Sequence, residues 1–183
     1  MTADLNHRGL DNWTALHFAA NEGHTEVVKE LLSHKADIER EPISSINRTP
    51  LHLAAMRGHT NIVRMIIESK GKTEVDRNCK DFDMNTPLHY ASEYGHFECI
   101  IYLVKEALAD ASIKNKFGYT PSDIAQNMKI RQLFDSLVPR GMTGGGDSSS
   151  SVGYGRTAVN GVLRHNDRIN TVQRLMHSYK NVN

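Results

Sequence analysis

Cysteine is scarce in this sequence, and the two cysteines present do not form a disulfide or metal-binding pattern. Cys79 and Cys99 are the only thiols in 183 residues, and neither has partners at ligand spacing. A short secreted domain held together by disulfides would carry several paired cysteines. The sequence therefore predicts reduced thiols in an intracellular protein.

Long hydrophobic runs are also missing. No apolar stretch approaches the roughly 20 residues that a helix needs to cross a bilayer. The first ten residues, MTADLNHRGL, contain no apolar segment of the kind found in signal peptides. We therefore expect no membrane span and no secretory signal, and we predict a cytoplasmic location.

The sequence lacks the usual patterns of catalysis and metal binding. No pair of histidines at helical spacing is joined by an acidic ligand, which argues against zinc. Asp81 and Asp83 lack the glycine and the terminal glutamate of a calcium loop. Neither thiol has the histidine partner of a catalytic nucleophile, and no lysine follows the run GGGDSSSS as it would in a phosphate loop. We predict no enzyme activity, metal, cofactor or small-molecule substrate.

The net charge is close to zero but unevenly distributed along the chain. Basic residues number 22 and acidic residues 21, which argues against nucleic acid as a partner of the whole chain. From Arg140 onward there are six basic and two acidic residues, against 16 basic and 19 acidic before it. The C-terminal part is therefore basic, and the rest is slightly acidic.

Residues 49 to 67, TPLHLAAMRGHTNIVRMII, contain two short helical patterns separated by a break. Thr49 can cap the first helix, and Pro50 suits its first position. Gly58 can adopt the positive φ that ends a helix. Neither helix is long enough to be stable alone in water. Each has an apolar face that another element must cover.

The same unit recurs along the chain. Thr14, Thr86 and Thr120 open further copies, so the four opening threonines are separated by 35, 37 and 34 residues. A repeat of this length is typical of a solenoid of stacked units. The pattern Thr-Pro-Leu-His-x-Ala, followed by Gly-His, resembles the ankyrin repeat. The resemblance covers residues 4 to 137.

The resemblance implies an all-α ankyrin-repeat solenoid of stacked helix–turn–helix units with finger loops. The ankyrin-repeat domain would span residues 1–139, with repeats at about 11–43, 46–80, 83–115 and 117–138. We expect the atypical fourth repeat, with a short second helix, to cap the stack. In this family histidines at two fixed positions tie the turn to the helix start, which assigns a structural role to His17, His52, His89, His24, His59 and His96.

The C-terminal part of the chain has two interpretations. Residues 140–152 are rich in glycine and serine and predict a flexible linker. Residues 153–183 are similar to a degenerate fifth ankyrin repeat, because Thr157 follows Thr120 by 37 residues. Alternatively, Asp167 to Tyr179 forms a detached basic amphipathic helix that docks on a partner groove or an anionic surface.

The resemblance also indicates where a partner would bind. In ankyrin proteins the residue before the opening threonine and the two residues that end the first helix line a concave groove, to which the finger tips contribute. Tryptophan, tyrosine and arginine dominate binding hot spots. The competing interpretation is that Trp13 only covers the open first repeat and that Phe82 and Phe117 pack against their own fingers. The predicted partner-binding set is Trp13, Arg48, Met56, Arg57, Phe82, Asn85, Tyr94, Phe117, Tyr119 and Arg156.

These residues predict a non-catalytic protein–protein interaction module. We expect a scaffold or a fixed subunit of a larger protein complex, for example a cytoskeletal or ciliary one. One alternative is an ankyrin-type inhibitor or regulator of a kinase or a transcription factor. Another is docking of the basic C-terminal tail on an acidic surface, which could be an acidic protein tail, lipid or RNA.

Overall fold

The computed structural model describes residues 6–7, 13–34, 36, 47–69 and 75–137. All described residues belong to one compact unit, which lies within Met1–Thr143. Every regular element among them is helical. The linker predicted at 140–152, the fifth repeat or helix predicted within 153–183, and Arg156 lie outside the described residues.

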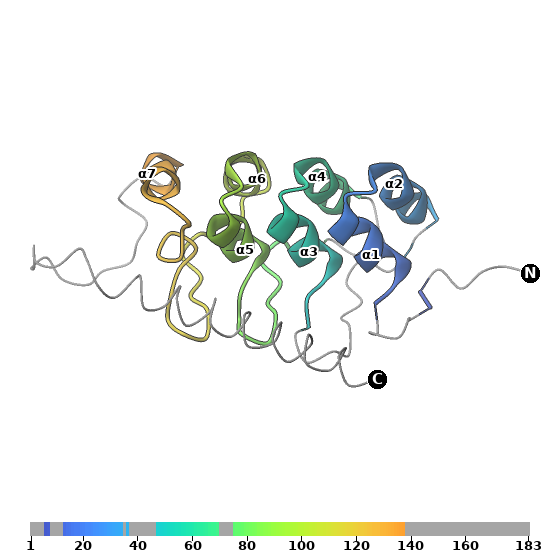
Figure 1. Ribbon diagram of the computed structural model, residues 1–183, viewed down its shortest axis with the longest axis horizontal. Helices are drawn as coiled ribbons and strands as arrows, with labels where there is room; N and C mark the ends of the chain where they lie inside the picture. The colour runs from blue at the N-terminus through green and yellow to red at the C-terminus, as the bar shows by residue number, and fades with distance from the viewer. Residues whose placement is uncertain (1–5, 8–12, 35, 37–46, 70–74, 138–183) are drawn as a thin grey trace, which may run out of the picture. The chain divides into compact units, whose positions relative to one another are not determined.

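The helices form two rows (Figure 1). The inner row contains α1 (Ala15–Glu22), α3 (Pro50–Arg57) and α5 (Pro87–Tyr94), and neighbouring members of this row pack together. The outer row contains α2 (Thr25–Ser33), α4 (Thr60–Glu68), α6 (Phe97–Ile101) and α7 (Met128–Leu137). A π-helical turn, η1 (Tyr102–Glu106), continues α6. The prediction of stacked helix–turn–helix units is confirmed.

Each inner helix begins and ends where the sequence predicts. Thr14, Thr49 and Thr86 are extended residues at the N-terminal caps, each forming a capping box with the histidine three residues later. Gly58 closes α3 with φ 72°, a left-handed conformation that an L side chain rarely adopts. These local signals limit the inner helices to two turns, so their stability comes from packing.

The fourth repeat differs from the prediction at both of its helices. Residues 121–124 form turns instead of a first helix, although the Asp123 carboxylate accepts hydrogen bonds from the Thr120 amide (2.8 Å) and hydroxyl (2.7 Å), as His52 accepts from Thr49 in a capping box. Its second helix, α7, has ten residues and is not short, since α4 has nine. The side chain of Asn127 caps α7 by accepting the Ile130 amide at 3.1 Å.

The core lies between the two helical rows and continues from repeat to repeat. Small residues at the centre of each inner helix, Ala20 in α1 and Ala55 in α3, are fully buried and let neighbouring helices approach closely. In α5 the equivalent residue is Ser92, which, like the two alanines, stands six residues after the opening threonine. Its side chain is also fully buried, and its hydroxyl has no hydrogen-bond partner among the residues that the structure describes.

We expect Ser92→Ala to stabilise the protein by about 1–2 kcal/mol. A buried hydroxyl without a partner loses its hydrogen bonds to water on folding, and alanine removes that cost without leaving a sizeable cavity. The measurement is urea unfolding followed by circular dichroism. The reverse change, Ala55→Ser, is the control and should destabilise by a similar amount. A Ser92→Ala variant less stable than the parent would show that the hydroxyl is bonded in solution.

Candidate protein-binding surface

The capping-box histidines of the second and third repeats, His52 and His89, join their own repeat to the next one. The Thr49 amide donates to Nδ1 of His52 at 3.1 Å, so the ring proton lies on Nε2, which donates to the Asn85 carbonyl at 3.1 Å. In the next repeat, Nε2 of His89 donates to the Tyr119 carbonyl at 3.0 Å. Each accepting carbonyl stands immediately before the next opening threonine. These bonds fix the base of each finger against the preceding inner helix.

A second histidine series makes contacts in the opposite direction along the stack. Nε2 of His59 donates to the Asn21 carbonyl at 3.2 Å, and Nε2 of His96 donates to the Met56 carbonyl at 3.0 Å. Both acceptors lie near the C-terminus of the preceding inner helix. The structural role predicted for the histidines is therefore confirmed at His17, His52, His59, His89 and His96, whose hydrogen bonds the structure defines.

The buried imidazoles make stability depend on pH. Burial lowers the pKa of His52 from 6.5 to about 4; the nearby Asp81 carboxylate opposes this shift and Arg48 adds to it. Burial also lowers the pKa of His89. A lowered histidine pKa means that the unfolded chain takes up the proton first. Stability is therefore complete above about pH 6.5, the unfolded value, and is lost as the pH falls toward 4.

At pH 5, His52 alone should cost about 2 kcal/mol of unfolding free energy relative to pH 7.5, at about 1.4 kcal/mol for each pH unit below 6.5. Urea unfolding at the two pH values measures this difference. His52→Gln, which cannot titrate, should be less stable at pH 7.5 and should show a smaller loss at pH 5. Equal losses in the parent and the variant would place the proton uptake elsewhere.

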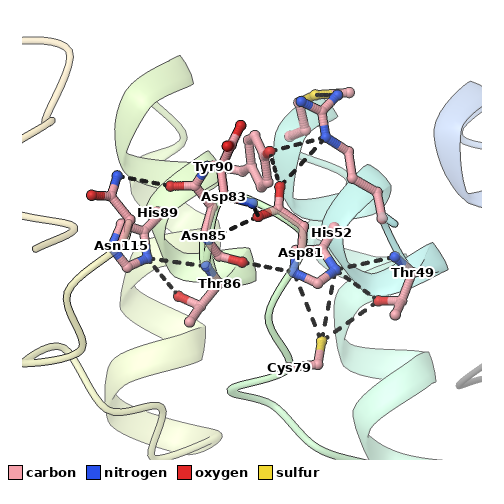
Figure 2. A network of polar contacts seen from close by, with 12 residues as sticks. Thr49, His52, Cys79, Asp81, Asp83, Asn85, Thr86, His89, Tyr90 and Asn115 are labelled. Atoms are coloured by element: carbon pink, nitrogen blue, oxygen red, sulfur yellow. Dashed lines mark hydrogen bonds and ion pairs between the residues drawn. The ribbon is translucent and has the colours of Figure 1, made fainter. Parts of the chain in front are cut away.

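Figure 2 shows the polar network that these histidines join, with the buried carboxylate of Asp81 near its centre. Oδ1 of Asp81 accepts the amides of Asp83 (3.0 Å) and Asn85 (2.8 Å), which shapes the finger. Oδ2 accepts the Tyr90 hydroxyl, which in turn accepts Nε of Arg48 at 2.9 Å. Asp81, considered for a calcium loop in the sequence, is therefore a structural acceptor.

Arg48 is held within the molecule by several contacts at once. Its guanidinium lies 4.7 Å from the centre of the Tyr90 ring, and Nη1 lies 3.6 Å from the Met56 sulfur. Only 23% of its side chain is exposed. A partner can reach the edge of this side chain, but the Arg48 guanidinium already binds the hydroxyl and the ring of Tyr90.

Asn85 is buried and forms hydrogen bonds with both neighbouring repeats. Its carbonyl accepts from His52, and its side-chain oxygen accepts a hydrogen bond from the side-chain nitrogen of Asn115 at 3.0 Å. We therefore remove Asn85 from the candidate binding surface. The sequence could not show this, because the position before the opening threonine carries a half-buried or exposed side chain in the other described repeats.

The two described fingers are joined and expose apolar side chains. The Lys116 amide donates to the Asp83 carbonyl at 2.8 Å, and the Lys116 ammonium lies 3.6 Å from the Asp83 carboxylate. Asn115 shapes the second finger as Asp81 shapes the first, since its Oδ1 accepts the Phe117 and Tyr119 amides. The aromatic and methionine side chains exposed on these fingers are Phe82, Met84, Phe117 and Tyr119.

Met84 is a member of this surface that the sequence prediction missed. Its φ is 61°, and the residues two before Thr49 and Thr120, Asn47 and Gly118, also have positive φ. A methionine in this left-handed conformation costs on the order of 1–2 kcal/mol relative to glycine. The signal in the sequence was a methionine at a position that otherwise carries asparagine or glycine, which tolerate positive φ. Strain of this kind often marks functional sites.

The remaining predicted residues differ in accessibility. Trp13 is half-buried, with its ring edge-on to Phe18 at 4.9 Å and stacked on His17 at 6.2 Å. Arg57 is exposed, and its Nε donates to the Asn21 side chain at 3.2 Å. Tyr94 is partly exposed at the end of α5, and desolvation raises the pKa of its hydroxyl.

Comparison with known families accounts for the repeated architecture. Residues 2–78 match a family model described as ankyrin repeats (3 copies), and residues 72–125 match one described as ankyrin repeats (many copies). The chain belongs to the ankyrin-repeat family. The recognition and fold class predicted from the sequence are therefore confirmed, and repeats of this family are generally protein–protein interaction modules.

Individual relatives share only a small part of their length with this ankyrin chain. Mouse oxysterol-binding protein-related protein 1 is 40% identical over 58 residues, which is 32% of this chain and 6% of the relative. The human protein of the same name is 38% identical over 58 residues, with the same coverage. Potassium channel SKOR of Arabidopsis thaliana is 40% identical over 63 residues, or 34% of this chain and 8% of the channel.

The described ankyrin repeats hold no cluster suited to metal binding, since no group of three or more His, Cys, Asp or Glu side chains comes together within them. Burial raises the pKa of the Cys99 thiol to about 12, so this thiol is protonated at neutral pH. No helix in the described part of the chain is long and apolar enough to cross a membrane.

Proposed function

We propose that this ankyrin stack is a non-catalytic protein-binding module that holds its partner in the concave groove and against the fingers. The observation that supports this most directly is the exposed apolar surface at the linked finger tips, where Phe82 is 60% exposed. Aromatic residues give a large contact area with few rotamers to immobilise. Trp13, Arg57 and Tyr94 extend the proposed surface along the inner row, with Arg48 and Met56 contributing their exposed edges.

The module acts, in this proposal, as a scaffold or a fixed subunit of a larger cytoplasmic assembly; a cytoskeletal or ciliary assembly is one such setting. Inhibition of a kinase or a transcription factor would use the same surface. The names of the matched relatives describe those proteins, and the shared stretch is too small a part of them to carry their activities to this chain.

The finger surface is tested by comparing variants in a quantitative cross-linking experiment in native extract. We expect the double variant Phe82→Ser and Phe117→Ser to lose at least tenfold in recovery of the main cross-linked partner, because both aromatic side chains lie at the contact. Its unfolding midpoint should stay within a few degrees of the parent value, since both side chains are exposed.

Phe97→Ser provides the matched control, because Phe97 is an exposed phenylalanine at the start of α6 in the outer row. It should retain the partner. Equal recovery with the finger variant and with the control would move the binding site away from the fingers. Loss of partner together with a large loss of stability would return Phe82 and Phe117 to a structural role.

The basic C-terminal region carries a second proposal, supported by its six basic and two acidic residues from Arg140 onward. It would dock on an acidic protein tail, anionic lipid or RNA. Binding by the full chain should then weaken steeply with salt and should weaken further when Arg164, Arg168 and Arg174 are changed to glutamine. Salt-independent binding would reject this role.

A further inference from the structure

One position of the inner helices is buried in the second and third repeats but exposed in the first. Four residues after the opening threonine stand Leu53 in α3 and Tyr90 in α5, each 1% exposed. The equivalent residue of α1 is Phe18, which is 46% exposed. A phenylalanine this exposed at a core position leaves much of its burial energy unrealised.

The outer helices repeat this difference. Val27 of α2 is 48% exposed, whereas its equivalents in the three later outer helices are 0–1% exposed: Ile62, Cys99 and Ile130. Val27 and Phe18 therefore occupy two positions that are buried in the later repeats, but both side chains are exposed in the first repeat.

Contacts in the later repeats show what supplies that cover. The Tyr90 hydroxyl and ring contact Arg48, and the ring lies edge-on to His52 at 5.9 Å, so this position faces the preceding repeat. By equivalence, Phe18 and Val27 face the side of the stack on which the described residues supply no further helix pair. We call this surface, formed by Phe18, His24, Val27 and Glu30, the N-terminal face.

The polar members of the N-terminal face indicate which chemistry would fit it. Glu30 is exposed, and its equivalent in the third repeat is Tyr102. The centre of the Tyr102 ring lies 4.5 Å from the guanidinium of Arg64, which belongs to the preceding outer helix. If another helix pair stacked on the first repeat, its residue equivalent to Arg64 would lie against Glu30. A basic side chain there would form an ion pair with the Glu30 carboxylate.

His24 adds a directional hydrogen bond to this face. Its equivalents His59 and His96 donate Nε2–H to a carbonyl near the end of the preceding inner helix, at 3.2 and 3.0 Å. Their rings also lie over the glycine that ends that helix, and a Cβ added at Gly58 would be 2.4 Å from Nδ1 of His96. A neighbour for His24 would thus offer a free helix-end carbonyl beside a glycine.

We propose that the N-terminal face is a docking surface for a helix–turn–helix unit of another protein, separate from the groove and fingers. This unit presents aliphatic side chains to Phe18 and Val27, a lysine or arginine to Glu30, and a glycine-terminated inner helix to His24. A second copy of this chain does not offer such a surface at the other end of the described stack, where the exposed side chains of α7 are polar apart from Met128: Lys129, Gln132, Asp135 and Ser136.

The probe is a designed stack of consensus ankyrin repeats, free of tryptophan, whose last helix pair has the sequence Thr14–Lys35 and no polar helix after it. In this chain that helix pair, α1 and α2, already packs against α3 and α4, so its exposed end has the required shape. It contains Gly23, and it contains Lys29 at the position equivalent to Arg64.

The full-length protein is titrated with this probe, and the emission of Trp13, its only tryptophan, reports docking because the Trp13 ring touches Phe18. We expect a saturable shift in emission. Val27→Glu should weaken the affinity at least tenfold. Ile101→Glu, at another partly exposed residue of the outer row (38%, against 48% for Val27), should leave the affinity unchanged. Glu30→Lys should also weaken it, by placing two cations together.

Three results would overturn the proposal. The first is no shift in Trp13 emission at any probe concentration with a folded protein. The second is a shift that Val27→Glu leaves intact, which would place docking elsewhere. The third is concentration-dependent dimerisation of the full-length protein that Val27→Glu abolishes, measured by analytical ultracentrifugation, which would make a second copy the occupant.

Discussion

Gly58→Ala should destabilise the protein by about 3 kcal/mol, the result of two separate costs. Gly58 has φ 72°, where a Cβ costs on the order of 1–2 kcal/mol. The added Cβ would also lie 2.4 Å from Nδ1 and 2.7 Å from Cγ of His96. That ring cannot retreat freely, because its Nε2 donates to the Met56 carbonyl. Moving it would break a bond between the second and third repeats.

Gly118→Ala isolates the first of these costs. Gly118 has φ 82°, and nothing lies within 4 Å of the position that its Cβ would take. This variant should lose only about 1 kcal/mol. Thermal unfolding followed by circular dichroism compares the two, and the Gly58→Ala midpoint should fall on the order of 10 °C. Equal losses in the two variants would show that His96 adjusts without cost.

Asp81→Ala is the second large effect, with an expected loss of about 3 kcal/mol. The change leaves the Asp83 and Asn85 amides and the Tyr90 hydroxyl without their acceptor. Removing one partner of a buried polar network costs about 3–5 kcal/mol. We expect the lower value of this range because Arg48 can be hydrated once the carboxylate is removed. Its side chain is 23% exposed, and its Nε lies 3.9 Å from the Asp81 carboxylate.

Asp83→Ala serves as the control, since this neighbouring carboxylate is 39% exposed and its ion pair with Lys116 is at the surface. It should cost less than about 1 kcal/mol. Urea unfolding gives both values. Hydrogen exchange should also show that Asp81→Ala releases the finger amides of Asp83 and Asn85. A loss below 1 kcal/mol for Asp81→Ala would mean that water satisfies the network in solution.

The binding surface could be predicted only in part from the sequence. The position before each opening threonine was treated as one class, yet Asn85 is buried and Arg48 is held by Tyr90 and Met56. Which side chain at a repeated position faces solvent depends on residues from the neighbouring repeat. Tyr90 decides the case of Arg48, and no feature near Arg48 in the sequence indicates this contact across 42 residues.

The sequence by itself determined the repeat period, the helix starts at the threonines and the helix ends at the glycines. These features are set within a few residues, by capping and by backbone conformation, so local sequence is sufficient. Tertiary structure decided the buried network around Asp81, the linked fingers and the exposure of Phe18 and Val27. Those depend on what the adjacent repeat places against each side chain, because a stacked unit buries its faces only against its neighbours.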